Sequence, residues 1–226
     1  MARVKICGIT NLDDALASID AGAAALGFNF YPQSPRYIAP SVARDIIQQL
    51  PASIMCVGVF VNLTDAEQVK RQASEAGVQA VQLHGDESPA YCQQLKDFFV
   101  IKALRVNSDF EPQQASRYET EAILLDGFSP LAYGGVGQSF DWSVAAQTRQ
   151  LVEKLFLAGG LNANNVATAI ESVQPYAVDA CSGLESVPGR KDMAKVRAFI
   201  AAAREAGGAK TIGPISPIGP IRGLIQ

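Results

Sequence analysis

A thiol and a carboxyl group stand at the ends of two short apolar segments in this chain of 226 residues. Cys7 ends the segment 3–7 and Asp126 ends the segment 121–126, and a glycine follows each of them. A thiolate can remove a proton and a protonated carboxyl group can donate one, so this pair is suited to moving two protons on one substrate. A buried cysteine is often only a small apolar residue. The position of Cys7 at a segment end beside glycine favours a chemical role.

Lys5 and Asp179 are further polar residues inside apolar segments. Side chains alternate along an extended strand, so Lys5 shares a face with Cys7, and Asp179 shares a face with Cys181. A cation beside a thiol raises the thiolate fraction, and Lys5 is the candidate for that cation. The alternative is that Lys5 and Asp179, together with Gln82, only satisfy one another in a polar interior. Both interpretations stay open from the sequence.

The elements that must position these residues form a regular alternation. Short apolar segments predict eight strands, near 3–7, 23–28, 54–61, 78–83, 98–103, 121–126, 154–158 and 176–181. Amphipathic or Ala-rich stretches predict eight helices, near 11–21, 40–50, 64–76, 88–97, 111–119, 141–152, 162–173 and 192–206. Asn11 or Thr10, Thr64, Ser88 and Asn162 are expected to cap helix starts.

Eight strands that alternate with eight helices favour a single α/β domain, a (β/α)₈ or TIM barrel, over residues 1–206. Barrel closure removes the two edges that eight open parallel strands would leave, although an open sheet is the alternative. Residues 207–226 are rich in Gly and Pro and repeat Ile-Gly-Pro-Ile, so we expect a flexible tail outside the barrel. In such barrels the active site lies at the carboxyl ends of the strands, where Cys7 and Asp126 stand.

A glycine pair follows the seventh predicted strand and a Ser-Gly pair follows the eighth, at the positions where barrel enzymes often hold a phosphate group. Glycine lets backbone N–H groups approach an anion closely. The predicted phosphate-binding residues are Gly159, Gly160, Ser182 and Gly183, with Gly135 and Gly137 after the sixth strand as further candidates. The alternative is that these glycines only make tight turns.

The composition of the chain limits which classes of molecule the protein is expected to bind. The net charge of −3 comes from 19 basic and 22 acidic residues and gives no basic surface for nucleic acid. No apolar run approaches the roughly 18 residues of a membrane span. Four scattered cysteines and a single histidine make a metal site improbable, so we expect no metal, no cofactor and a cytoplasmic protein. We expect a monomer or a homodimer with a small phosphorylated substrate.

Several motifs in series resemble phosphoribosylanthranilate isomerases. They are Lys5-Ile6-Cys7-Gly8-Ile9-Thr10, Gly27-Phe28 with Ser34-Pro35-Arg36, Gly58-Val59-Phe60, Gln82-Leu83-His84-Gly85, Leu125-Asp126 with Gly134-Gly135-Val136-Gly137 and Phe140-Asp141-Trp142, Leu157-Ala158-Gly159-Gly160-Leu161, and Ser182-Gly183-Leu184-Glu185 with Pro188-Gly189-Arg190-Lys191-Asp192. They cover residues 3–206 in order. The family usually has Thr at Val136 and a sequence like Asp-Val-Ser-Ser where this chain has Asp179-Ala180-Cys181-Ser182.

The resemblance implies an Amadori rearrangement in tryptophan biosynthesis, from N-(5-phosphoribosyl)anthranilate to 1-(2-carboxyphenylamino)-1-deoxyribulose 5-phosphate. It implies Asp126 as general acid and Cys7 as general base, and Arg36 as the partner of the anthranilate carboxylate. His84 is expected to line the site or orient the ligand. Two alternatives remain: a non-catalytic sugar-phosphate-binding barrel, and another phosphoribosyl-processing barrel enzyme of histidine or tryptophan biosynthesis.

Overall fold

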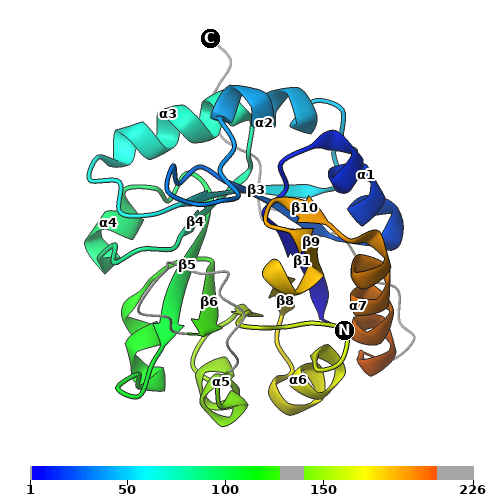
Figure 1. The fold of residues 1–226 in the computed structure, drawn as a ribbon. Helices are drawn as coiled ribbons and strands as arrows, with labels where there is room; N and C mark the ends of the chain where they lie inside the picture. Colours follow the sequence, from blue (N-terminus) through cyan, green and yellow to red (C-terminus); the bar gives the residue numbers. More distant parts are fainter. Residues whose placement is uncertain (1, 128–139, 208–226) are drawn as a thin grey trace.

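The computed structural model of the chain describes residues 2–127 and 140–207. Eight parallel strands close into a barrel and helices surround it (Figure 1). Each strand pairs with the next in the chain, and the last pairs with the first. The strands are β1 (Arg3–Cys7), β2 (Ala25–Asn29), β3 (Met55–Phe60), β4 (Ala80–Leu83), β5 (Phe99–Val106), β6 (Ala122–Gly127), β7 (Leu155–Leu157) and β8 (Ala177–Ala180). The predicted (β/α)₈ barrel is confirmed.

The α-helices of the outer layer are α1 (Leu12–Ala21), α2 (Pro40–Ile47), α3 (Ala66–Ala76), α4 (Pro89–Gln93), α5 (Trp142–Arg149), α6 (Val166–Val173) and α7 (Met193–Ala206). Their ends follow local chemistry. The Asn11 side chain accepts the N–H of Asp14 at the start of α1, and the Ser88 side chain accepts the N–H of Tyr91 at the start of α4. Within the described ranges, no helix is long and apolar enough to cross a membrane.

Several helix predictions differ from the structure in the type of helix, the capping residue or a boundary. The stretch predicted as a helix over 111–119 is the 3₁₀ helix η1 (Pro112–Arg117), which buries only Ala115 and so has no apolar stripe that would stabilise a longer α-helix. Asp65 rather than Thr64 caps α3. The helix expected from 162 begins at Val166, because the Asn162 and Asn165 side chains hold a turn instead.

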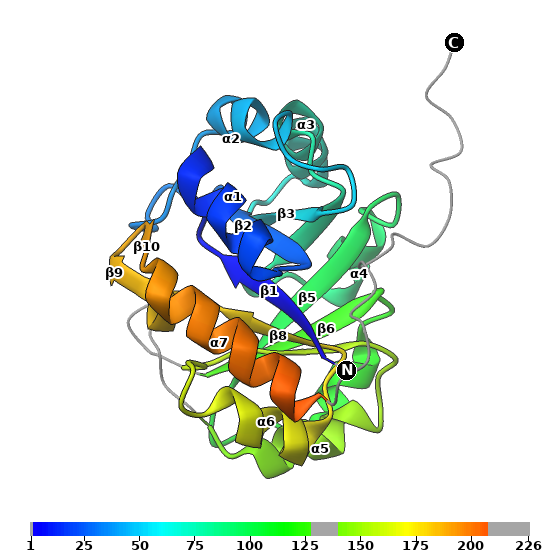
Figure 2. The ribbon, with the colours of Figure 1, turned by 90° about the vertical axis from the view of Figure 1, so that its right-hand side faces the viewer.

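The loop after β8 contains structure that the apolar pattern did not predict. It forms the short 3₁₀ helix η2 (Ser182–Leu184) and a hairpin of β9 (Glu185–Val187) and β10 (Arg190–Lys191). In Figure 2 this hairpin lies at the end of the barrel away from the start of β1. The hairpin therefore stands beside the carboxyl ends of the strands.

Two apolar cores explain which side chains face the site. One lies between strands and helices, and the other fills the barrel with residues such as Ala25, Ile101, Leu124 and Phe156. Strand alternation then directs side chains two residues further along a strand into the same interior. Lys102 on β5 points out toward the helices, because its neighbours Ile101 and Ala103 point into the barrel.

Candidate active site

Cys7 is at the carboxyl end of β1 and is almost fully buried. It pairs in register with Gly27 on β2. A Cβ atom at Gly27 would lie 2.7 Å from Sγ of Cys7 and 3.1 Å from Nζ of Lys5. Only glycine leaves this space free, and the thiol and the ammonium group therefore lie together on the inner side of β2.

The environment of Cys7 favours its thiolate. A hydrogen bond with the thiol of Cys181 lowers the pKa of Cys7 most; burial raises this pKa, and the charges of Lys5 and Lys191 lower it again. The net result is a pKa of Cys7 well below its ordinary value. By contrast, burial raises the pKa of Cys56 to about 12, as expected for a thiol among apolar side chains.

Lys5 and Asp179 form an ion pair inside the barrel, as one of the two interpretations of the sequence predicted, but Gln82 does not join them, because its amide contacts His84 instead. Nζ of Lys5 lies 3.0 Å from Oδ1 of Asp179, and β1 and β8 place the two residues side by side. Burial raises the pKa of Asp179 to about 6, against the lowering effect of Lys5. Burial tends to lower the pKa of Lys5, but Asp179 and Cys7 outweigh it and keep this pKa above its usual value. The Lys5 ammonium group thus lies close enough to Asp179 and to Cys7 to favour a negative charge on each of them.

Asp126 lies at the end of β6 with its side chain inside the barrel mouth and 7% of its surface exposed. Oδ2 of Asp126 is 3.2 Å from Nε2 of His84. Asp126 is also near enough to Asp179 for its charge to raise the pKa of that carboxyl group. Side chains from β6 and β8, and the residue that follows β4, therefore meet in one mouth, together with Cys7 of β1.

The side chain of Gln82, on β4, forms a hydrogen bond with His84, with Nε2 of Gln82 2.7 Å from Nδ1 of His84. With the amide as the donor, Nδ1 accepts and the ring hydrogen is on Nε2. Nε2 of His84 is buried and, within the described part of the chain, has no partner with hydrogen-bond geometry. A polar atom of this kind is available to a ligand.

A second buried ion pair supports the loop that carries His84. Nζ of Lys102 lies 2.7 Å from Oε2 of Glu87 and donates hydrogen bonds to the carbonyl oxygens of Leu83 and Gly85. Glu87 in turn accepts the N–H groups of Gly85 and Asn62. The prediction for the site did not include Glu87, because in sequence it is one acidic residue among others in a polar loop.

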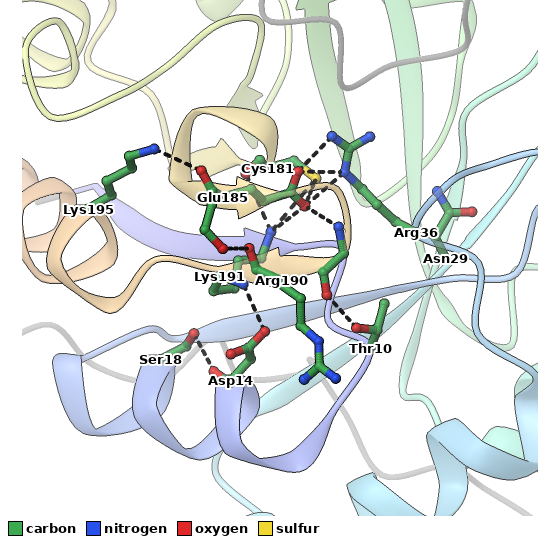
Figure 3. Close-up of polar contacts among 12 residues, drawn as sticks. Thr10, Asp14, Ser18, Asn29, Arg36, Cys181, Glu185, Arg190, Lys191 and Lys195 are labelled. Carbon is green, nitrogen blue, oxygen red and sulfur yellow. Dashed lines mark hydrogen bonds and ion pairs between the residues drawn. The ribbon is translucent and has the colours of Figure 1, made fainter.

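Arg36, in the loop after β2, is not free in solvent but paired with Glu185 of β9 (Figure 3). Nε and Nη2 of Arg36 donate to the two carboxylate oxygens of Glu185 at 2.7–3.1 Å. A local turn helps to position Arg36, because the Ser34 hydroxyl accepts the backbone N–H of Arg36. This bidentate pair fixes the guanidinium plane and leaves Nη1 without a partner among the described residues.

Glu185 also forms an ion pair with Lys191, as Figure 3 shows. Nζ of Lys191 lies 3.1 Å from Oε1 of Glu185 and 4.0 Å from Sγ of Cys181. Burial alone would raise the pKa of Glu185, but Arg36 and Lys191 lower it below its ordinary value. The predicted site did not include Glu185 or Lys191, although both lie in motifs that carried the resemblance.

The predicted phosphate-binding residues lie close together. Gly159 and Gly160 both have positive φ, and a Cβ atom at Gly183 would lie 2.5 Å from the carbonyl oxygen of Leu161, so the loops after β7 and β8 touch. In residues 2–127 and 140–207, no protein acceptor takes the backbone N–H groups of Gly159, Gly160, Ser182 or Gly183. The predicted candidates Gly135 and Gly137 lie outside the described residues. Within the described residues no cluster of three potential metal ligands occurs.

Comparison with known proteins agrees with this geometry. The model of the family described as N-(5′-phosphoribosyl)anthranilate (PRA) isomerase matches residues 4–202. An N-(5′-phosphoribosyl)anthranilate isomerase from Pelobacter propionicus is 48% identical over 205 residues, which are 91% of this chain and 97% of that protein.

Two solved structures extend the agreement to three dimensions. Phosphoribosyl anthranilate isomerase from Thermotoga maritima is 46% identical with a TM-score of 0.85, over 91% of this chain and all of that one. A phosphoribosyl anthranilate isomerase in complex with reduced 1-(o-carboxyphenylamino)-1-deoxyribulose 5-phosphate is 44% identical with a TM-score of 0.82, over the same shares of the two chains. The chain belongs to the N-(5′-phosphoribosyl)anthranilate isomerase family and is an isomerase of tryptophan biosynthesis.

Proposed function

We propose that Cys7 is the general base and Asp126 the general acid in the isomerisation of N-(5′-phosphoribosyl)anthranilate. Asp126 in its protonated form donates to the furanose oxygen as the bond from that oxygen to C1 breaks, which gives an iminium ion. The Cys7 thiolate then removes the proton from C2, and the resulting enolamine tautomerises to the ketose. Each proton transfer contributes on the order of 10²–10⁴ in rate.

The observation that carries this proposal is the placement of the two groups. β1 and β6 are separated by β7 and β8 in the ring of strands, so Cys7 and Asp126 approach the mouth from different sides. Both are buried, and each has neighbours that suit its proposed role, with cations near Cys7 and His84 near Asp126. A sugar between them has one group on each side, as a ring opening followed by proton removal at C2 requires.

Arg36 and His84 are proposed to bind the anthranilate and sugar portions. Glu185 occupies the Nε and Nη2 side of the Arg36 guanidinium, so Nη1 can donate to the anthranilate carboxylate. Nε2 of His84 is buried without a directed partner in the described residues, which supports a hydrogen bond to a ligand hydroxyl or to Asp126. In this proposal His84 orients the ligand and transfers no proton in the reaction.

The substrate phosphate is proposed to bind where the loops after β7 and β8 touch. Four backbone N–H groups, those of Gly159, Gly160, Ser182 and Gly183, point to no acceptor in the described residues. Hydrogen bonds to a charged group contribute about 1.5–3 kcal/mol each, so a few of them suffice to anchor the phosphate. Phosphate bound after the seventh and eighth strands is common in barrels of this kind.

An isomerase assay tests the proposal. The fluorescence of the anthranilate-type substrate is followed during conversion by the purified chain and by its Asp126→Asn variant. We expect the variant to bind substrate with nearly normal affinity and to lose on the order of 10²–10⁴ in kcat, because an amide cannot donate a proton to the ring oxygen. Near-normal turnover by Asp126→Asn would remove Asp126 from the mechanism.

We propose the following oligomeric state, cellular location and domain bounds for the chain. A relative from Thermotoga maritima is described as dimeric and has been converted to monomers, which supports a monomer or a homodimer for this chain. Light scattering after gel filtration distinguishes the two.

All four cysteines are free thiols, as is usual in a reducing compartment, which supports a cytoplasmic location. Residues 1–206 form the catalytic barrel domain in this proposal, and 207–226 are a tail outside it.

A further inference from the structure

Gln82 is a buried polar side chain to which the reaction steps above give no role. It lies on β4, where Ala80 points into the barrel, so Gln82 and His84 point into the same interior at successive levels. Its neighbours in register, Val59 on β3 and Ile101 on β5, are apolar. Only 1% of the Gln82 surface is exposed. An amide in such surroundings is unfavourable unless it makes hydrogen bonds, so its contacts indicate what it does.

The Gln82 amide contacts the His84 ring. Nε2 of Gln82 lies 2.7 Å from Nδ1 of His84, and Oε1 of Gln82 has no partner within the described residues. The backbone at His84 is held separately, because its N–H donates to the carbonyl oxygen of Phe60 and Nζ of Lys102 donates to the carbonyl oxygens of the two flanking residues. The backbone therefore fixes where the ring lies. The Gln82 contact fixes how the ring is turned, because Nδ1 faces the amide in only one of its two orientations.

The contact between His84 and Asp126 determines which ring nitrogen has the hydrogen. Burial alone does not, since either orientation of the Gln82 amide leaves one of its polar atoms without a partner in the described part of the chain. Nε2 of His84, however, lies 3.2 Å from Oδ2 of Asp126. A carboxylate oxygen attracts an N–H group and repels the lone pair of a bare ring nitrogen, so the hydrogen is on Nε2. Nδ1 is then an acceptor, and the Gln82 amide donates to it.

We propose that Gln82 is a positioning residue for the reaction: its amide donates to Nδ1 of His84 and so keeps the ring hydrogen on Nε2, beside the carboxyl group of Asp126. This role of Gln82 rests on the proposed role of Asp126 as general acid. A bare nitrogen at this distance from a protonated carboxyl group would take up its proton, because imidazole is the stronger base. A nitrogen that already has its hydrogen cannot, so the proton of Asp126 stays available to the furanose oxygen. Protonation of Nδ1 instead would break the hydrogen bond from Gln82.

The position of the ring hydrogen can be measured by ¹⁵N nuclear magnetic resonance, because the chain contains a single histidine. The sample is the untagged full chain with ¹⁵N-labelled histidine, at mildly alkaline pH. A ring nitrogen with a hydrogen and a bare one have well-separated shifts, and couplings to the two ring C–H groups distinguish Nδ1 from Nε2. We expect the hydrogen on Nε2 in the wild type. Hydrogen on Nδ1 in the wild type overturns the proposal, whatever the variants show.

Two variants of Gln82 test whether its amide is the cause. Gln82→Glu presents only acceptors when ionised, so the ring hydrogen should move to Nδ1. Gln82→Met removes the donor and keeps a flexible side chain of similar length, so a fraction of the rings should have their hydrogen on Nδ1. We expect kcat/KM to fall by about tenfold in Gln82→Met, the effect of one lost hydrogen bond, and further in Gln82→Glu. A ring hydrogen that stays wholly on Nε2 in both variants overturns the proposal.

A merely structural role of Gln82 would also lower activity, so Gln82→Met is combined with His84→Ala. If Gln82 acts through the ring, its substitution changes kcat/KM by no more than about twofold once the ring is absent. Equal losses with and without the ring overturn the proposal. The control Gln79→Met removes a glutamine hydrogen bond of 2.8 Å just before β4, and should change neither the ring hydrogen nor kcat/KM. If the ring hydrogen moves as expected while Asp126→Asn stays fully active, the role of Gln82 stands and Asp126 as the acid fails.

Discussion

At the scale of single residues, Asp179 is a carboxyl group whose folded-state pKa is about 6, raised by burial from an ordinary value of 3.8. Between these values the native state holds a proton that the unfolded chain has lost. The contribution of Asp179 to stability is therefore present below about pH 4 and is lost as the pH rises to about 6. A difference of this size between the folded and unfolded pKa values corresponds to about 3 kcal/mol.

Urea unfolding of the wild type and of Asp179→Asn at several pH values between about 4 and 7 measures this dependence. The difference between the two proteins isolates the effect of Asp179 from that of other titrating groups. Asp179→Asn carries no carboxyl group at this position and should therefore lack this part of the pH dependence. The wild type should lose stability relative to the variant as the pH rises; a difference that stays flat contradicts the account.

Arg36 provides a second residue-scale prediction. Lysine keeps the positive charge but cannot hold Glu185 with two parallel hydrogen bonds and donate to a ligand carboxylate at the same time. Arg36→Lys should therefore raise KM by about tenfold or more and lower kcat much less. Steady-state kinetics separates the two constants. A variant with normal KM would show that Arg36 makes no substrate contact.

At the scale of elements, the β9–β10 hairpin is attached to the barrel through buried charges. Glu185 holds Arg36 and Lys191, while Nζ of Lys195 on α7 donates to the Glu185 carbonyl oxygen. Glu185→Gln leaves two buried cations without a counter-charge, so the free energy of unfolding should fall by about 3 kcal/mol.

A matched control for this prediction is Glu67→Gln, which removes the exposed pair of Glu67 with Lys70 on α3. Exposed pairs contribute little to stability. Chemical denaturation should then show a clear loss for Glu185→Gln and almost none for the control. Equal losses in the two variants would mean that the hairpin is not held by its charges.

The eight strands could be predicted from the sequence because apolar runs of strand length recur between helical stretches. The hairpin could not be, because β9 and β10 are three and two residues long and two of their residues are held by contacts with distant elements. The start of α6 was missed for a related reason. Asn162 can cap a helix, but here its side chain accepts the N–H of Asn164 within a turn.

At the scale of the whole molecule, barrel closure brings Cys7 and Asp126 into one mouth. Topology alone implies this, since the carboxyl ends of all eight strands lie on one face. The pairing of Arg36 with Glu185, separated by 149 positions, could not be predicted in this way, because it depends on how two loops meet. The same holds for the contact between His84 and Asp126.

The barrel and its helices span Arg3 to Ala206, and the family model matches residues 4–202. Deletion of 208–226 should therefore leave kcat/KM and the midpoint of urea unfolding unchanged, because every described strand and helix and every proposed site residue precede this range. Parallel assays of the full and shortened chains measure this. A loss of either property would assign the tail a role in the barrel.

The most direct test of the central claim is the single-turnover rate of Cys7→Ala at saturating enzyme concentration, measured with substrate that carries either hydrogen or deuterium at C2. We predict a rate lower by on the order of 10²–10⁴, with substrate affinity changed only a few-fold, because the base that removes the C2 proton is gone. Removal of the C2 proton should also become more strongly rate-limiting, which the isotope effect reports. A single-turnover rate within a few-fold of the wild type would contradict Cys7 as the base.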